Sequence, residues 1–287
     1  MNIILMLLPA ITWGVLPLAV AKVKGRPINQ ILGTAVGTLL VSSIVYVIMR
    51  PELSAASFFL AALAGAFWII GQLGQYTGYS KIGVSRTMPI STGLQLIGTS
   101  LIGVLIFGEW SSTNARLLGA FGILLLIVGV VLTAVRDKGS AADQRKGNMI
   151  STLVMLVLTT LGYLVYNSIP SAMTDSGLAI FMPESVGMFV AVLLYIIFTR
   201  QLKVLREKAS WQGLLAGIIF SVGAISYILS VRDNGVNTAF VVSQVSVVIS
   251  TLGGILFLHE KKSQRELILT ISGLILVVMG AILTTTI

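Results

Sequence analysis

The chain has 287 residues, of which 56% are hydrophobic and only 10% are charged, and its mean hydropathy is +0.98. This composition excludes a water-soluble domain and indicates a helical protein that crosses the membrane many times. The net charge of +9 does not indicate nucleic-acid binding, because the basic residues fall in short connections between apolar segments. With no cysteine and only one histidine, His259, the chain offers no disulfide and no thiolate or histidine metal cluster, and no cofactor is expected.

Ten apolar segments are long enough to cross about 30 Å of hydrocarbon, which takes roughly 20 helical residues. The first has no basic region before it and no small-residue cleavage site after it, so we expect a true span and not a cleaved signal peptide. The predicted fold class is therefore an all-α integral membrane protein with ten transmembrane helices. The segments cover residues 2–21, 28–49, 53–79, 87–108, 115–135, 148–169, 178–199, 211–231, 236–258 and 267–287.

Basic residues are distributed unevenly among the connections between these segments. Sixteen of the 19 Lys and Arg residues belong to odd-numbered connections, whereas the even-numbered ones contain only Arg50, Arg116 and Arg232. The cytoplasmic connections of membrane proteins are enriched in Lys and Arg. We therefore expect a multi-pass protein of the cell membrane whose odd connections are cytoplasmic and whose two termini are extracellular.

The second half of the chain repeats features of the first at an offset of 150 to 152 residues, although 29 glycines also produce chance coincidences. Five spans per copy is an odd number, so the second copy must enter the membrane inverted, as in alternating-access transporters. We expect a first repeat over 1–138, a cytoplasmic linker over 139–147 and a second repeat over 148–287. The matched pairs are Gly37 and Gly187, Arg50 and Arg200, Gly71 and Gly223, Gly83 and Gly235, Ser91 and Ser243, Glu109 and Glu260, Gly122 and Gly273, and Gly129 and Gly280.

The third segment contains the stretch "AFWIIGQLGQYTGYSKIG" (66–83), which is unusually polar for a membrane span. Its glycines let a neighbouring helix approach closely. Its amides lie on an aromatic face and indicate a ligand, although interhelical hydrogen bonds worth about 0.6 kcal/mol each are the alternative. Tyr79 is expected to be an anchor at the membrane interface. The two neighbouring stripes consist of Trp68, Gln72, Gln75, Tyr76 and Tyr79, and of Gly71, Gly74 and Gly78.

Other segments contribute further uncharged polar groups. Amides and hydroxyls both donate and accept hydrogen bonds, and aromatic faces stack on C–H surfaces, which suits a neutral sugar. Anionic substrates would call for buried Arg or Lys, and multivalent cations for buried acids. Isolated Ser and Thr residues are more often packing groups. The candidate substrate-binding residues are Trp13, Trp68, Gln72, Gln75, Gln95, Tyr163, Asn167, Ser243 and Gln244.

Glu184 is the only one of the ten carboxylates that falls inside a predicted span and away from its ends. An ionisable group within the membrane is a functional candidate, and this one could carry a proton together with the substrate. The alternative is that Pro183 begins the helix, so that Glu184 occupies its first turn and is stabilised by the helix dipole.

Short motifs along nearly the whole chain carry a family resemblance. They are "TWGVLPL" (12–18), "NQILGTAVG" (29–37), "GQLGQ" (71–75), "TMPISTGLQLIGTSL" (87–101), "FGEW" (107–110), "ESVGM" (184–188) and "SQVSVVISTLGGI" (243–255). With these motifs the chain resembles the bacterial glucose/ribose uptake family of the drug/metabolite transporter superfamily. The resemblance implies a secondary active transporter that imports a monosaccharide by alternating access, coupled to protons. It also implies that Trp13, Gln72, Gln95 and Gln244 lie in or near the sugar site.

Two other classes of protein are alternatives to a sugar importer. An exporter or exchanger of another small metabolite, such as an amino acid, a nucleoside or a drug, would share the fold. Among these, an exporter of apolar or cationic drugs should have a larger apolar cavity or an acid at mid-membrane. A membrane enzyme would show acidic or histidine clusters at an interface, and the sequence contains none. We therefore expect a transporter and not an enzyme, with a monosaccharide, the lipid bilayer and protons as its partners.

Overall fold

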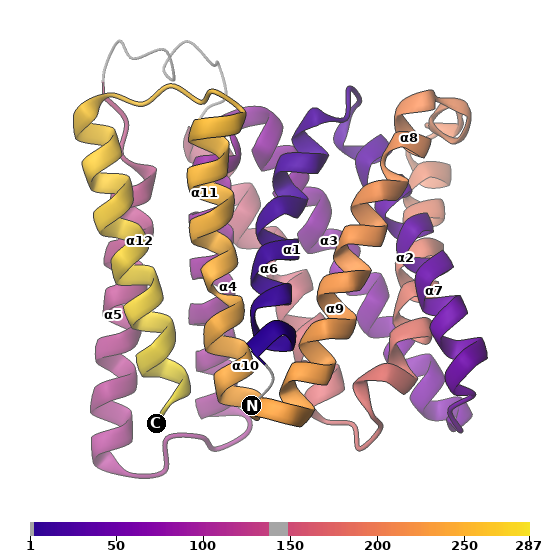
Figure 1. Cartoon of the computed structure of the whole chain (residues 1–287), viewed down its shortest axis with the longest axis horizontal. Coiled ribbons are helices and arrows are strands. Elements are labelled where there is room, and N and C mark those ends of the chain that lie inside the picture. Colours follow the sequence, from indigo (N-terminus) through magenta and orange to yellow (C-terminus); the bar gives the residue numbers. More distant parts are fainter. Residues whose placement is uncertain (1–2, 138–148) are drawn as a thin grey trace.

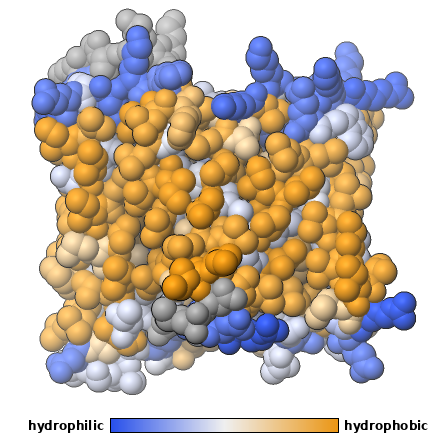
Figure 2. Space-filling view, in the orientation of Figure 1, coloured by the Kyte–Doolittle hydropathy of each residue, from blue (hydrophilic) through white to orange (hydrophobic). Residues whose placement is uncertain are grey.

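The computed structural model describes residues 3–137 and 149–287, apart from the side chain of residue 237, and every regular element in these ranges is a helix. Ten spans stand side by side in one bundle, and an apolar band separates two polar ends (Figures 1 and 2). The all-α, ten-helix membrane class is thus confirmed. The spans are α1 (Ile3–Lys22), α2 (Pro27–Met49), α3 (Ala55–Ile82), α4 (Val84–Leu105), α5 (Thr113–Ala134), α6 (Met149–Ser171), α7 (Gly177–Phe198), α8 with α9 (Lys208–Gln212 and Leu214–Asn234), α10 with α11 (Val236–Ser243 and Val245–Phe257) and α12 (Gln264–Thr285); the 3₁₀-helix η1 (Leu202–Arg206) precedes α8.

The two ends of the bundle differ in charge. We call the end at which α1 begins and α12 ends the terminal end, and the opposite one the basic end (Figure 1). The connections at the terminal end contribute Arg50, Arg116 and Arg232, whereas the other described Lys and Arg residues belong to the basic end. Because successive helices run in opposite directions, the uneven distribution of basic residues along the sequence becomes a difference in charge between the two ends of the bundle.

The fourth span begins three residues earlier than the sequence predicted. Gly83 adopts φ +87°, ends α3 and begins α4 with no loop between them, so that Arg86 lies in the first turn of α4. Arg86 is buried there because its guanidinium lies 3.2 Å from the Glu266 carboxylate, which is also buried. Glu266 in turn accepts a hydrogen bond from the backbone N–H of Asp137 (2.9 Å), so the pair joins α4, the end of α5 and α12 at the basic end.

A second basic side chain is partly buried next to this ion pair. Lys262, in the connection between α11 and α12, donates to the hydroxyl of Thr270 (2.9 Å). Burial and the positive charge of Arg86 lower the pKa of Lys262 to about 8. The basic end is therefore closed by packed charges and not only by a layer of solvated ones.

Small residues bring the backbones of neighbouring spans into contact. A Cβ on Gly129 of α5 would lie 2.7 Å from the carbonyl oxygen of Gly273 on α12, and one on Gly280 would lie 2.7 Å from that of Gly122. On α3, a Cβ on Gly65 would overlap the carbonyl oxygen of Glu184 on α7. Such contacts are the usual packing device where lipid supplies no hydrophobic driving force between helices.

Replacing Gly65 by valine is expected to lower the thermal stability of the detergent-solubilised protein. The added side chain has to push α3 and α7 apart, and overpacking of this kind costs roughly 1–3 kcal/mol. The measurement is a melting curve followed by size-exclusion chromatography. Ala56→Val, at an exposed position of the same helix, is the matched control and should leave the curve unchanged; equal melting of the two variants would contradict the packing described.

Candidate functional site

The polar face of α3 points into the bundle. Trp68, Gln72, Gln75, Tyr76 and Tyr79 are all buried, with exposed fractions between 0% and 7%. The glycine stripe beside them lies against other helices, as its small residues predicted. Gly71 faces the ring of Tyr163 and Gly74 faces Thr159, both on α6, and Gly78 faces Thr87 on α4.

A chain of hydrogen bonds links side chains of α3, α4 and α6. The Tyr163 hydroxyl donates to Gln72 Oε1 (2.6 Å), and Gln72 Nε2 donates to Gln75 Oε1 (3.2 Å). Gln75 Nε2 donates to Ser91 Oγ (2.9 Å), which also lies 3.3 Å from Gln95 Nε2. We call these five residues the amide chain. None of them carries a charge at neutral pH.

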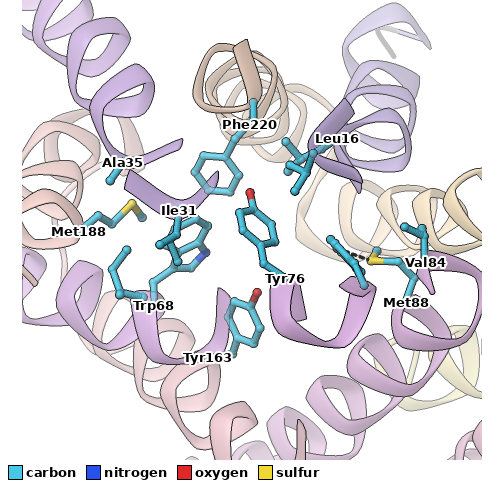
Figure 3. Packing of buried hydrophobic residues seen from close by; sticks show 14 of the residues in the cluster. Leu16, Ile31, Ala35, Trp68, Tyr76, Val84, Met88, Tyr163, Met188 and Phe220 are labelled. Carbon is cyan, nitrogen blue, oxygen red and sulfur yellow. Dashed lines mark hydrogen bonds between the residues drawn. The ribbon is translucent and has the colours of Figure 1, made fainter. Parts of the chain in front are cut away.

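Aromatic rings from four helices gather next to the amide chain. The Trp68 ring lies 4.9 Å from Phe220 of α9 and 6.5 Å, edge to face, from Tyr163. Trp13 of α1 lies 6.5 Å from Phe220 and donates its indole N–H to the Phe220 carbonyl (3.4 Å). Figure 3 shows the rings of Trp68, Tyr76, Tyr163 and Phe220 turned toward one region inside the bundle. Phe220 therefore connects the two indoles.

The chemistry of this region suits a neutral ligand with several hydroxyls. Each amide has two N–H donors and an oxygen with two lone pairs, so it can bond a hydroxyl as donor and as acceptor. Bonds between the amides can be exchanged for bonds to a ligand with little net cost, because both states keep the polar atoms satisfied. In residues 3–137 and 149–287, no group of three His, Cys, Asp or Glu side chains is placed to hold a metal ion.

Comparison with known proteins decides the family. A family model described as "Sugar transport protein" matches residues 4–287. The chain belongs to this sugar transport family. It is 54% identical to a putative sugar uptake protein of Lactobacillus johnsonii, with 99% of each chain covered. It is 39% identical to the glucose uptake protein GlcU of Bacillus subtilis (98% and 97% covered) and 38% identical to the putative ribose uptake protein RbsU of Latilactobacillus sakei (99% and 97%).

These findings confirm the resemblance that the motifs carried, and the relatives are named as uptake proteins and not as enzymes. One solved crystal structure shares the fold with a TM-score of 0.62 over 99% of this chain and 97% of its own. Its sequence identity is only 12%, so that likeness extends to the fold alone.

In this sugar transport family member, the candidate substrate-binding residues fall into two groups. The structure brings Trp13, Trp68, Gln72, Gln75, Gln95 and Tyr163 together in the amide chain and its aromatic neighbours. Among the described residues, no hydrogen bond or ring contact joins the other three candidates to this cluster. Asn167 is exposed near the end of α6. Ser243 and Gln244 lie at the junction of α10 and α11, and both donate to the Phe240 carbonyl, at 2.7 and 3.3 Å.

Glu184 is buried, with 6% of its surface exposed, and no hydrogen bond among the described residues links it to the amide chain. Its carboxylate accepts a hydrogen bond from the hydroxyl of Tyr166 on α6 (3.5 Å). The alternative in which Pro183 begins the helix is wrong. Helix α7 begins six residues earlier, at Gly177, where the side chain of Ser176 caps it by accepting from the backbone of Ala179.

The prediction of an interfacial anchor at Tyr79 is also wrong. Only 7% of this side chain is exposed, its hydroxyl donates to the sulfur of Met88 (3.0 Å), and its ring lies 5.7 Å from that of Tyr76. The reason is the sharp turn at Gly83, which folds α4 back along α3 and covers the side chain.

Three contributors to the site were missed from the sequence. Phe220 lies in an apolar run, where a phenylalanine does not differ enough from its neighbours to indicate a site. Tyr166 lies three residues after Tyr163 on α6 and is partly buried, and a second tyrosine at helical spacing could have indicated it. Thr34 of α2 shares a hydrogen bond with the hydroxyl of Tyr76 (3.0 Å), which ties α2 to the polar face of α3.

Proposed function

We propose that this sugar transport family member imports a monosaccharide, with glucose and ribose as the first candidates, and that the amide chain binds it. The observation that carries the proposal is the uncharged hydrogen-bonded chain Gln72–Gln75–Ser91 with Tyr163 and the Trp68 ring beside it. The relatives that are named for glucose and for ribose uptake support the same substrate class.

The proposed mechanism is alternating access between two inverted five-helix halves, 1–138 and 148–287. Contacts between helices support it because they are reciprocal. With Gly122 equivalent to Gly273 and Gly129 to Gly280, the contact of Gly122 with Gly280 is the symmetry copy of the contact of Gly129 with Gly273. A twofold relation between halves makes paired contacts of this kind. The proposed linker, 139–147, lies outside the described residues.

The reciprocity extends to the candidate site. Gly71 of α3 faces the ring of Tyr163 on α6, and its counterpart Gly223 of α9 faces the ring of Trp13 on α1. In the proposed arrangement the two aromatic candidates would occupy matching places, one from each half. A substrate held between them would contact both halves, as alternating access requires.

The proposed orientation puts the basic end in the cytoplasm and both termini outside the cell. The excess of Lys and Arg at the basic end supports this orientation. We further propose that Glu184 carries a proton that is imported with the sugar, since it is a buried carboxylate within a span and its described hydrogen-bond partner is a neutral tyrosine.

Replacing Gln72 by alanine is expected to weaken the binding of glucose or ribose about tenfold. The reason is the loss of hydrogen bonds worth roughly 1–2 kcal/mol, and 1.4 kcal/mol corresponds to a factor of about ten. Isothermal calorimetry on the purified protein measures the affinity. Gln212→Ala, in the exposed part of α8, is the control. Unchanged affinity in a folded Gln72→Ala protein would return this residue to a packing role, and the absence of binding of either sugar to the wild type would reject the substrate class.

Replacing Glu184 by glutamine is expected to abolish accumulation of sugar driven by a pH gradient while sugar exchange continues. A glutamine keeps the size of the side chain and its hydrogen bond to Tyr166 but cannot exchange a proton. Uptake into proteoliposomes, with and without the gradient, separates the two activities. Glu52→Gln, at an exposed acid of the terminal end, should behave as the wild type. Full accumulation by Glu184→Gln would rule out the proton role.

A further inference from the structure

Two acids follow helices whose ends have similar backbone structure. Glu109 follows α4, and Glu260 follows α11. The N–H of Glu109 donates to the carbonyl of Gly103 (3.0 Å), and the N–H of Glu260 donates to the carbonyl of Gly254 (3.2 Å). Each bond spans six residues and closes the end of a helix. Glu109 lies at the terminal end of the bundle and Glu260 at the basic end.

The helix junctions at these two ends are also alike. At the basic end Gly83 joins α3 to α4 with φ +87° and ψ 164°, and at the terminal end Gly235 joins α9 to α10 with φ +83° and ψ 156°. A positive φ of this size favours glycine. Each junction leaves the first N–H groups of a new helix pointing along the bundle, and these groups need an acceptor outside the helix.

At the basic end the acid is bound to the helix. The Glu260 carboxylate accepts from the backbone N–H of Val84 (2.7 Å) and from that of Ser85 (2.9 Å), which are the first residues of α4. These are charge-assisted bonds at the positive end of a helix dipole. Val84 is 1% exposed and Ser85 is 0% exposed, so this end of the bundle is closed over the junction.

At the terminal end the corresponding contact, between Glu109 and the start of α10, is not made. Val236, the first residue of α10, is 61% exposed, and no atom lies within 4 Å of the position that a Cβ on Gly235 would take. The same position on Gly83 is 2.7 Å from the Glu260 carboxylate. Glu109 is exposed, and within the described residues its carboxylate has no hydrogen bond or ion pair.

We propose that Glu260 and Glu109 are reciprocal latches, one for each end of the transporter. In the present state Glu260 holds the N-terminus of α4 and closes the basic end. In the opposite state Glu260 releases α4, and Glu109 binds the first N–H groups of α10 and closes the terminal end. The proposal rests on alternating access as the proposed mechanism, since only a protein with two such states needs two latches.

The two latches would alternate because buried backbone N–H groups need a hydrogen-bond acceptor. Water satisfies the first N–H groups of a helix while that end of the bundle is open, but closure expels the water and leaves buried donors without an acceptor. A carboxylate in the right place supplies the missing acceptor. Because each state makes one such contact and gives up the other, the two states stay close in free energy and both remain accessible.

The test uses the absence of cysteine from the natural sequence. Single cysteines at Val84 and at Val236 report the access of a membrane-impermeant maleimide to the basic and the terminal end of the detergent-solubilised protein. The measured quantity is the ratio of the labelling rate at 84 to that at 236. Glu260→Gln should raise this ratio about tenfold, as expected for replacing a charge-assisted pair of bonds by a neutral one. Glu109→Gln should lower it, because the opposite state loses its latch.

Three outcomes would overturn the proposal. They are a ratio unchanged by Glu260→Gln, a ratio that both substitutions move in the same direction, and an equal change in the control Glu52→Gln. A second variant leaves both acids in place. Val236→Pro removes the first N–H of α10 at a position where proline is tolerated, and it should slow labelling at 84 as Glu109→Gln does. Unchanged labelling at 84 would likewise reject the terminal latch.

The latch proposal and the proposed sugar substrate can be rejected independently of each other. Labelling is measured without any substrate, so opposite shifts of the ratio together with an absence of glucose and ribose binding would retain the latches and reject the sugar. Sugar binding together with an unmoved ratio would reject the latches and retain the proposed substrate.

Discussion

The structure depends on one constraint, which is that polar groups inside a membrane must find their partners within the protein. The buried Glu266 carboxylate, which is paired with Arg86 and accepts from the backbone of Asp137, meets this requirement at the basic end, and the amide chain around Gln72 and Gln75 meets it inside the bundle. A polar network that is satisfied internally but uncharged can exchange its bonds for those of a neutral solute. The same requirement that holds the helices together therefore also supplies the uncharged polar groups to which we assign the sugar.

Glycine makes this arrangement compact. On α3 one face consists of small residues that admit α6, and the neighbouring face consists of the amides and rings that α6 completes with Tyr163. A displacement of α6 would therefore alter packing and hydrogen bonding together. Helix α9 meets α1 through Gly223 and Trp13 in the same manner.

Much of this could be predicted from the sequence. Hydropathy gave the ten spans and helical spacing gave the buried face of α3, because both patterns are local. The places where prediction failed are set by contacts between distant segments. Tyr79 is covered because Gly83 turns α4 back on α3, and Phe220 gains its place only when α9 packs between Trp13 and Trp68.

Transport of a monosaccharide by this bundle can be measured as uptake of radiolabelled glucose and ribose into proteoliposomes, with and without an inward proton gradient. Liposomes without protein are the control. We expect that at least one of the two sugars enters, that an excess of the same unlabelled sugar competes with it, and that an inward proton gradient drives its accumulation. If neither sugar enters or competes, the protein is not a transporter of glucose or ribose.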